Sequence, residues 1–405
     1  MKKAKPVIVR CCLKKRTKSE KERFMKRFIC LILCILTLFS TGAVGYCDGE
    51  LPGGLSAKAE ILYEANTGQI LWSKNADAKL PIASVTKTMS LLLWAEAIDK
   101  GKLTLEEKVK ASSAAAGTEG STIWLNIGEE MTAAELLEAV IVNSANDACV
   151  ALAEHISGSE AEFVKLMNKR AKELKMTSTR FRNCTGLDAD GHYSSARDIA
   201  IVTAELMKHE VYRGWFLTWV DYLRGGETQL VNTNKLIRYY DGILGGKTGT
   251  TDAAGCCLAA CAERKNMKLI AVTLGCDEDG ERFDECERLL DYGFERFELF
   301  SPEIDFNKLK PVKVTRGTLS QIDPIIKRQG EECVIGKGRA KDVKYEYTFA
   351  EELEAPIEKG QFVGEYLVTV DGAEVFRSEI VAKNDIPRMN FWLCFIRLLI
   401  SIISM

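Results

Sequence analysis

The chain has 405 residues, with 55 Lys or Arg against 57 Asp or Glu, so its net charge is −2 at pH 7. A chain of this length can form two or three domains with full hydrophobic cores. With a net charge near zero nothing points to nucleic acid, and we expect no nucleic-acid partner.

The N-terminal residues have the pattern of an export signal. Lys26-Arg27 precedes an apolar run from Phe28 to Phe39, and small residues follow at Ala43-Val44-Gly45. A basic start, a short apolar run and a small-residue cleavage site are the three parts of a signal peptide. We therefore expect residues 1–45 to be an N-terminal extension and signal peptide, cleaved after Gly45 or Ala43.

Two alternatives remain open at this end of the chain. Met25 would itself begin a good signal peptide, so the basic stretch from Met1 to Phe24 could come from translation upstream of the true start. Cys47 could carry a lipid, but Tyr46 before it fits the small-residue requirement of a lipoprotein poorly. Sequencing the mature N-terminus would distinguish these cases.

Residues 50–300 combine strand patterns at both ends with helical patterns in the middle. The helical patterns dominate between Ser84 and Glu210, and the strand patterns occupy Ala57–Glu64, Ile70–Ser73, Cys256–Glu263 and Leu269–Gly275. This segregation predicts an α+β domain whose antiparallel sheet is formed from the two ends of the segment.

The first motif of this domain, Ser84-Val85-Thr86-Lys87, follows Pro81 and opens a largely apolar helical pattern. Residues three apart share a helix face, so Lys87 is expected directly over the Ser84 hydroxyl. At the start of a helix, Ser84 also lies in a positive field with free N–H groups that can stabilise an oxyanion. The geometry favours Ser84 as a nucleophile.

Lys87 is the candidate base for Ser84, which requires a neutral amine. At pH 7 this means lowering its pKa by about three units from about 10.4. Burial against Leu91, Leu92 and Trp94, together with a second cation at Lys247, would act in that direction. Proton removal by Lys87 itself is a hypothesis.

Two further motifs follow, Ser144-Ala145-Asn146 and Lys247-Thr248-Gly249. The first can relay a proton, and the second offers a cation for a carboxylate. Alone, the three motifs would most often be a helix N-cap, a turn and a strand end. Together and in this order they supply a nucleophile, a base, a proton relay and a cation for a carboxylate. These are the groups that an acyl-transfer site needs.

This motif set resembles that of the active-site-serine penicillin-binding proteins and β-lactamases. The closer resemblance is to the low-molecular-mass D-alanyl-D-alanine carboxypeptidases, the serine DD-peptidases. It runs from about Lys58 to the C-terminus and includes four further blocks: Glu64–Gly68, Asn183–Leu187, His192–Asp198 and Asn232–Leu236.

The resemblance implies a β-lactamase/transpeptidase-like fold and a definite reaction. Ser84 would be acylated by the penultimate D-alanine carbonyl of a peptidoglycan stem peptide, with loss of the terminal D-alanine, and it would also be acylated by β-lactams. Lys87 would shuttle the proton, and Ser144 and Asn146 would complete the network that delivers it to the leaving amine. No cofactor is expected. Neither a histidine-based metal site nor a Ser-His-Asp triad is supported, because the histidines have scattered positions: His155, His192 and His209.

It also implies where the substrate binds. Lys247 and Thr248 of the third motif would hold the terminal carboxylate, next to Gly249. The backbone N–H groups of Ser84 and Thr250 would form the oxyanion hole, and Arg282 matches a family arginine near the carboxylate site.

Two other functions were weighed against this one. A class A-like β-lactamase uses a Glu to activate the deacylating water, usually in a Glu-x-x-Leu-Asn segment, whereas here Glu227-Thr228-Gln229-Leu230 is followed by Val231. A non-catalytic cell-wall scaffold would be favoured by loss of Ser84 or Lys87, and both are present. The sequence therefore favours the carboxypeptidase.

Residues 301–386 predict a small β-rich domain without catalytic residues. Alternating runs occur at Pro311–Arg316, Val343–Phe349, Phe362–Val370 and Glu374–Val381. Asp371-Gly372 between the last two suits a two-residue type I′ hairpin turn. The family resemblance implies a stalk or spacer role for this domain.

Residues 387–405 predict an amphipathic membrane-anchor helix. The less apolar positions, spaced by three and four residues, form one narrow helical stripe: Asn390, Cys394, Arg397, Ser401 and Ser404. About 17 residues reach about 25 Å, short of a bilayer core of about 30 Å, so an in-plane helix is expected rather than a span. A buried core helix is the alternative. With the signal peptide, this places the protein at the outer face of the bacterial cytoplasmic membrane.

Cysteine usage is unusual for an exported protein. Cys256, Cys257 and Cys261 follow the third motif closely, with Cys276 and Cys286 beyond. The spacing fits no common zinc pattern, so we expect small residues on buried strands, with free thiols, rather than a metal site. A disulfide is possible but cannot be assigned from the sequence.

Overall fold

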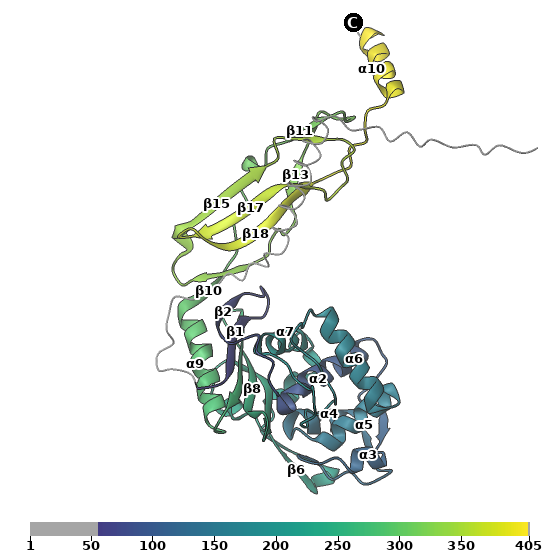
Figure 1. The fold of residues 1–405 in the computed structure, drawn as a ribbon, viewed down its shortest axis with the longest axis vertical. Helices are drawn as coiled ribbons and strands as arrows, with labels where there is room; N and C mark the ends of the chain where they lie inside the picture. The colour runs from purple at the N-terminus through teal and green to yellow at the C-terminus, as the bar shows by residue number, and fades with distance from the viewer. Residues whose placement is uncertain (1–55, 404–405) are drawn as a thin grey trace, which may run out of the picture. The chain divides into compact units, whose positions relative to one another are not determined.

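The computed structural model describes residues 56–403 (Figure 1). The predicted signal peptide and the lipidation alternative at Cys47 lie outside the described residues. The main feature of the first part is a five-stranded sheet in the order β2-β1-β9-β8-β7. Its strands are β1 (Ala59–Glu64), β2 (Ile70–Lys74), β7 (Ile243–Thr251), β8 (Gly255–Arg264) and β9 (Met267–Cys276).

Every neighbouring pair in this sheet is antiparallel. Strands β1 and β2 come from the start of the domain and the other three from its end, so the predicted α+β arrangement is confirmed. The four predicted strands are present, and the structure adds β7, which contains the third motif. Strand β7 is the last in the sheet order and pairs only with β8 among the described strands.

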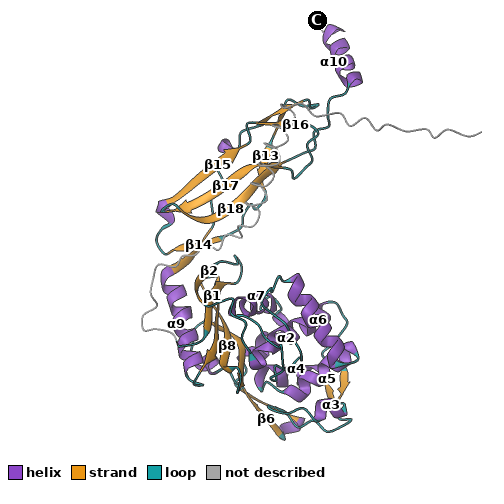
Figure 2. Cartoon of the chain, in the orientation of Figure 1, coloured by secondary structure: helices purple, strands orange, loops and turns teal. Residues whose placement is uncertain are grey.

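Alternate residues of the sheet enter two different cores, as the two-residue period of a strand requires. On β8, Cys257, Ala259 and Cys261 join the core of the helical side. Leu258, Ala260 and Ala262 join the core beneath α9 (Glu281–Arg296). Figures 1 and 2 show α9 on one side of the sheet and the other helices of this domain on the opposite side.

Among the described residues, the helical side is built from seven α-helices and two short antiparallel strand pairs. The helices are α2 (Lys87–Asp99), α3 (Ser113–Ala116), α4 (Ala133–Val142), α5 (Asn146–Ser157), α6 (Glu160–Glu173), α7 (Ala196–Leu206) and α8 (Arg213–Leu217). The strand pairs are β3 (Lys108–Lys110) with β4 (Glu130–Thr132) and β5 (Val220–Leu223) with β6 (Thr228–Val231).

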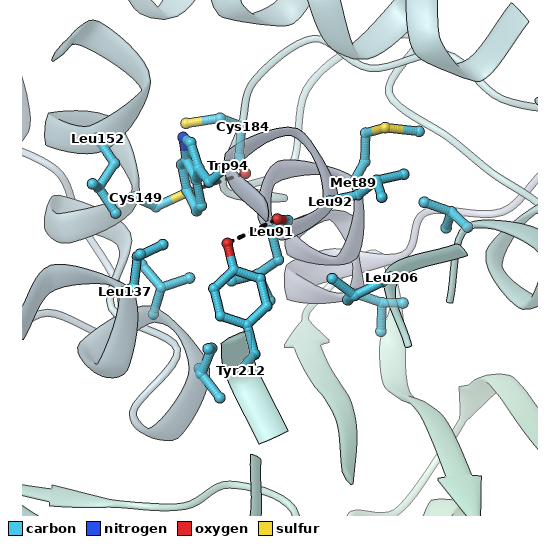
Figure 3. Close-up of a cluster of buried hydrophobic side chains, with 14 of the residues drawn as sticks. Met89, Leu91, Leu92, Trp94, Leu137, Cys149, Leu152, Cys184, Leu206 and Tyr212 are labelled. Atoms are coloured by element: carbon cyan, nitrogen blue, oxygen red, sulfur yellow. Dashed lines mark hydrogen bonds between the residues drawn. The ribbon is translucent and has the colours of Figure 1, made fainter. Parts of the chain in front are cut away.

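Helix α2 lies at the centre of this side and is buried around most of its circumference. Figure 3 shows Leu91 and Trp94 of α2 among side chains from the surrounding helices. The Trp94 ring stacks on Phe163 of α6 at 5.5 Å between centroids. Tyr212 donates a hydrogen bond from its hydroxyl to the Leu91 carbonyl at 3.1 Å. The helix that begins at the active-site motif is therefore held from several sides.

All nine cysteines of the described region are free thiols, and eight of them are buried. Cys256, Cys257 and Cys261 lie on β8, and Cys276 ends β9. Among residues 56–403, no group of three or more His, Cys, Asp or Glu side chains is placed to hold a metal ion.

The second part of the chain contains three small sheets. They pair β10 (Phe297–Phe300) with β14 (Cys333–Gly336); order β12 (Gln321–Ile322), β11 (Val312–Thr315) and β16 (Glu352–Glu354); and order β13 (Pro324–Ile326), β18 (Ala373–Ala382), β17 (Phe362–Val370) and β15 (Val343–Phe349). The four predicted strands are present. Asp371 and Gly372 between β17 and β18 have φ values of 52° and 82°, as the predicted type I′ turn requires.

The chain ends in α10 (Phe391–Ile403). Asn390 accepts a hydrogen bond from the Leu393 N–H at 2.9 Å and so caps the first turn. Phe391, Trp392 and Ile400 are 74%, 69% and 61% exposed. Within residues 56–403, no helix has both the length and the apolar character needed to cross a bilayer.

One buried carboxyl stands out in the first part of the chain. Glu60 on β1 is fully buried, and neither of its oxygens has a hydrogen-bond partner among the described residues. Burial raises the pKa of Glu60 to about 9, and the nearby Glu285 carboxylate adds to this, although Lys74 and Arg288 act in the opposite direction. Glu60 is therefore protonated in the folded protein at neutral pH.

We expect Glu60→Gln to stabilise the protein at pH 8 by about 1–3 kcal/mol, because the neutral amide removes the need to protonate a carboxyl. The folded pKa lies above the usual value of 4.5, so the stability that Glu60 contributes is lost as pH rises from about 4.5 towards 9. Thermal melts from pH 5 to 9 should show a flatter profile for the variant. An equal profile, or the same gain from Glu106→Gln at an exposed site, would contradict this.

Candidate active site

The proposed nucleophile lies in a tight turn before α2. Residues Ala83–Thr86 form one 3₁₀ turn, and the α-helix begins at Lys87, three residues later than predicted. The Lys87 ammonium nitrogen lies 2.8 Å from Ser84 Oγ, so the predicted contact is present. The 3₁₀ turn brings residues i and i+3 into register on one side, which supports this approach.

Main-chain atoms of three segments fix this turn. Ala83 has φ +47°, an unfavourable conformation for a residue with a Cβ. A Cβ at Gly186 would lie 1.8 Å from the Ala83 carbonyl oxygen, and one at Gly249 would lie 2.8 Å from the backbone nitrogens of Ser84 and Val85. Glycine is required at both positions because the backbones approach so closely.

Lys87 has three hydrogen-bond acceptors around its nitrogen, of which Ser84 Oγ is one. Its nitrogen also lies 2.6 Å from Asn146 Oδ1 and 2.8 Å from the Thr185 carbonyl oxygen. Neither oxygen can donate, so both accept N–H bonds. The Lys87 nitrogen donates to Ser84 Oγ as well, and loss of that proton would leave its lone pair facing the Ser84 hydroxyl.

Burial lowers the pKa of Lys87 to about 8, against the opposing influence of Cys149, Cys184 and Asp147. The direction and the main cause agree with the sequence-based hypothesis. Burial is also the main cause that lowers the pKa of Lys247, and the Lys87 charge adds to it, so the two buried lysines disfavour each other's charged form.

The second motif lies between α4 and α5. Asn146 begins α5 and donates from Nδ2 to the Glu119 carbonyl at 2.7 Å, which turns Oδ1 towards Lys87. Ser144 has φ +61° and is 6% exposed, and its Oγ has no hydrogen-bond partner among the described residues. The structure thus joins Asn146 to Lys87 directly and leaves the Ser144 hydroxyl free for another group.

The third motif lies on β7. Lys247 is 1% exposed, donates to the Thr248 carbonyl at 3.1 Å and forms no salt bridge within residues 56–403. Burial, Lys87 and Arg282 together hold the pKa of Lys247 well below its usual range. A substrate carboxylate would offset this and restore the full charge. Thr248 Oγ1 donates to Thr233 Oγ1 at 2.6 Å.

Arg282 of α9 reaches β7 from the face of the sheet that α9 covers, which is opposite to the helical side. One guanidinium nitrogen donates to the Gly249 carbonyl at 3.0 Å and to Thr250 Oγ1 at 2.8 Å, and another pairs with Asp279. Arg282 is 6% exposed. It is therefore next to the third motif, where its first effect is to position Gly249 and Thr250.

Some contributors to the site were not identified from the sequence. The carbonyls of Glu119 and Thr185 and the Thr233 hydroxyl act through backbone position or through another polar side chain, which no motif reveals. The signal that could have found two of them was the resemblance of the Asn183–Leu187 and Asn232–Leu236 blocks to the family.

A cleft of about 490 Å³ adjoins the Ser84 turn, and its walls include Ala83, Leu187 and His192. Burial lowers the pKa of His192 to about 4, so its ring is neutral at physiological pH. The ring bonds Thr86 Oγ1 at 2.8 Å and the Arg182 N–H at 3.1 Å. His192 therefore supports the nucleophile turn through its hydrogen bond with the Thr86 hydroxyl.

Comparison with protein families gives one match over residues 49–278, described as D-alanyl-D-alanine carboxypeptidase. The chain belongs to the D-alanyl-D-alanine carboxypeptidase family. A second match covers residues 294–388 and is described as the penicillin-binding protein 5 C-terminal domain. The family resemblance drawn from the motifs is confirmed.

Curated carboxypeptidases are similar over most of the chain. The D-alanyl-D-alanine carboxypeptidase DacF of Bacillus subtilis is 41% identical over 381 residues, covering 91% of this chain and 96% of its own. DacC of Escherichia coli is 34% identical, covering 84% and 86%.

Solved structures of carboxypeptidases and related proteins share the fold. Penicillin-binding protein 5 of Haemophilus influenzae has a TM-score of 0.76 at 31% identity, covering 84% of this chain and all of its own. Penicillin-binding protein D2 of Listeria monocytogenes, in its cefotaxime-bound form, has a TM-score of 0.55 at 32% identity, covering 60% and 98%.

Proposed function

We propose that this chain is a serine-type D-Ala-D-Ala carboxypeptidase that removes the terminal D-alanine of peptidoglycan stem peptides through a Ser84 acyl-enzyme. The observation that carries the proposal is the Lys87 amine, 2.8 Å from Ser84 Oγ, with its two other near neighbours both acceptors. The names of the curated relatives support the same activity.

Acylation begins when Ser84 Oγ attacks the penultimate D-alanine carbonyl and Lys87 takes the hydroxyl proton. The carbonyl oxygen gains the negative charge, and the N–H groups of Ser84 and Thr250 stabilise it, each by about 3–4 kcal/mol in the transition state. The C–N bond then breaks. Lys87, with Ser144 and Asn146, returns the proton to the leaving D-alanine amine, and water later hydrolyses the ester.

The terminal carboxylate of the substrate is bound by Lys247 and Thr248. Lys247 suits this role because no carboxylate of the described residues pairs with it. A β-lactam carries a carboxylate in the corresponding place and acylates Ser84 in the same way. Relatives solved with cefotaxime and with ampicillin support this.

Release of D-alanine from a diacetyl-Lys-D-Ala-D-Ala type peptide tests the function directly. The purified enzyme should release one D-alanine per peptide. Absence of release, with penicillin labelling intact, would contradict carboxypeptidase activity.

A class A-like β-lactamase is the nearest alternative enzyme, and a scaffold is the non-catalytic one. Glu227 is exposed at the turn between β5 and β6, so it does not supply a buried deacylating base. Slow hydrolysis of the benzylpenicillin acyl-enzyme fits the carboxypeptidase, and rapid turnover would favour the β-lactamase. A scaffold should give no covalent penicillin band.

We also propose that the enzyme is exported and rests on the outer face of the cytoplasmic membrane through α10. The exposed aromatic and aliphatic side chains of α10 support an interfacial helix, since Phe391 and Trp392 suit the headgroup boundary. A non-spanning anchor would keep the catalytic part close to nascent peptidoglycan.

Removing α10 should release a soluble and active enzyme. Met389 donates from its N–H to the Arg316 carbonyl, and the Thr318 N–H donates to the Pro387 carbonyl, so truncation is best placed at Asn390. Fractionation of cells should show the shortened protein away from the membrane, with unchanged D-alanine release. Ile396→Asp, at a site 48% exposed, should weaken attachment in the full chain. A truncated protein that stayed membrane-bound after signal cleavage would contradict the anchor.

A further inference from the structure

One exposed aromatic side chain beside the active site has no role in the reaction described so far. Trp124 is 77% exposed and Ile127 is 74% exposed, which makes them the most exposed large apolar side chains of the described residues before Pro302. Both lie in the loop of residues 117–129, which we call the Trp124 loop. Two large apolar side chains exposed in one loop are unfavourable in water, and they point to a binding surface where a second observation supports one.

The backbone of Trp124 is held in an unfavourable conformation. Its φ is +54°, in the left-handed region that an aromatic residue rarely adopts. The N–H groups of Ile123 and Leu125 both donate to the Asp147 carboxylate, at 3.1 and 3.0 Å. Ile123 and Leu125 are buried, so these bonds hold the two neighbours inward and turn Trp124 outward. Strain kept in place by surrounding bonds points to function rather than to stability.

The Trp124 loop is fixed to the catalytic machinery. Asn146, which bonds Lys87, donates from its backbone N–H to the Ser121 carbonyl at 2.7 Å and from Nδ2 to the Glu119 carbonyl at 2.7 Å. A second anchor is Arg224, which donates to the Ile123 carbonyl at 2.9 Å. The loop therefore presents Trp124 at a set place relative to Ser84.

We propose that Trp124 binds the sugar part of the peptidoglycan strand whose stem peptide enters the Ser84 site. This rests on the proposed function and identifies its substrate as glycan-bearing rather than free peptide. Aromatic faces pack against the C–H faces of sugar rings, and the surrounding polar groups of Thr122 and Asn126 can meet the sugar hydroxyls.

The dimensions agree with this assignment. Trp124 is three positions after Ser121, whose carbonyl accepts from the Asn146 N–H, so the Cα atoms of Ser121 and Trp124 are at most about 11 Å apart. The four residues on the acyl side of an extended stem pentapeptide reach about 14 Å. A sugar attached at the far end of such a peptide is thus within reach of the Trp124 loop.

Charge favours a glycan over a membrane surface as the occupant. Glu119 and Glu130 are exposed and flank the exposed apolar side chains. Lys110 lies opposite Glu130 in the β3–β4 pair, and Glu129 pairs with Arg224 at 2.6 Å, so the patch has no basic excess to attract anionic headgroups. Carboxylates repel the anionic lipids of a bacterial membrane. Sugar hydroxyls, in contrast, can donate hydrogen bonds to these carboxylates. The hydrogen bonds between this loop and Asn146 would also contribute nothing to membrane binding.

The test compares one pentapeptide with and without its disaccharide, using the full-length enzyme. Trp124→Asn is the informative variant, because Asn adopts a left-handed φ more readily than Trp and should not lower the melting temperature. We expect KM for the disaccharide-pentapeptide to rise about tenfold, the scale of one lost aromatic contact. The kcat, the free pentapeptide and penicillin acylation should change less than about twofold.

Trp124→Phe should restore most of the affinity, and Phe306→Asn, at a site 65% exposed, should have no effect. Equal losses on both substrates would overturn the proposal, since the loop would then act through Asn146. Unchanged KM with reduced binding to anionic vesicles would overturn it in favour of a membrane contact. If the wild-type enzyme releases D-alanine from neither substrate, the carboxypeptidase function itself fails, which is distinct from equal use of the two.

Discussion

Ser84→Ala is expected to eliminate both D-alanine release and covalent labelling by penicillin, with a loss of at least about 10⁴-fold in kcat/KM. Ser84 Oγ is the atom that forms the ester, and Lys87 alone cannot replace it as a nucleophile, because its amine is held by Asn146 and Thr185. Steady-state release of D-alanine and a fluorescent-penicillin gel measure the two losses.

The fold should survive this change, because the Ser84 side chain makes its hydrogen bond only with Lys87 among the described residues. Ser113→Ala, at an exposed serine of α3, is the matched control and should keep full activity and labelling. A Ser84→Ala protein that still forms a covalent penicillin band would show that another residue is acylated.

The rate of acylation by penicillin is expected to rise with pH and to level off above about pH 8. Burial lowers the pKa of Lys87 to about 8, so the neutral fraction increases as pH approaches that value. At pH 7 about one tenth of the molecules carry the neutral amine, about two hundred times more than with an ordinary lysine. Acylation time courses from pH 6 to 10 measure the profile.

Lys87→Ala should lower the acylation rate by at least about 10³-fold and remove this pH dependence, because proton transfer then has no positioned base. Lys165→Ala, at a lysine whose side chain is 71% exposed, should leave both unchanged. An unaltered acylation rate in Lys87→Ala would remove Lys87 from the role of base.

The sequence predicted those parts of the site that depend on short spacing. Ser84 and Lys87 meet because they are three residues apart, and the alternating runs gave β15, β17 and the Asp371-Gly372 turn. These are local properties, set by the period of a helix or strand and by turn chemistry.

Features that depend on the meeting of distant segments were not predictable in this way. The pattern before the third motif did not predict β7, because Gly245, Gly246 and Gly249 hide the two-residue period of a strand. The start of α2 was placed too early, since a 3₁₀ turn has nearly the same local pattern as an α-helix. The Ser144 hydroxyl is left without a partner among the described residues because Ser144 has a left-handed backbone conformation. The local sequence does not predict this conformation.

The glycine contacts around Ser84 have a consequence for biosynthesis. Gly186 and Gly249 both approach the backbone of residues 82–85, although the three segments lie far apart in the sequence. Contacts of such long range form only when the intervening chain has been brought together, at a cost in loop-closure entropy. The nucleophile turn is therefore complete only after β7 has been synthesised and added to the sheet, so a nascent or clipped chain lacking it contains the serine but no working hydrolase. Penicillin labelling of this protein thus reports on completed folding as well as on the presence of Ser84.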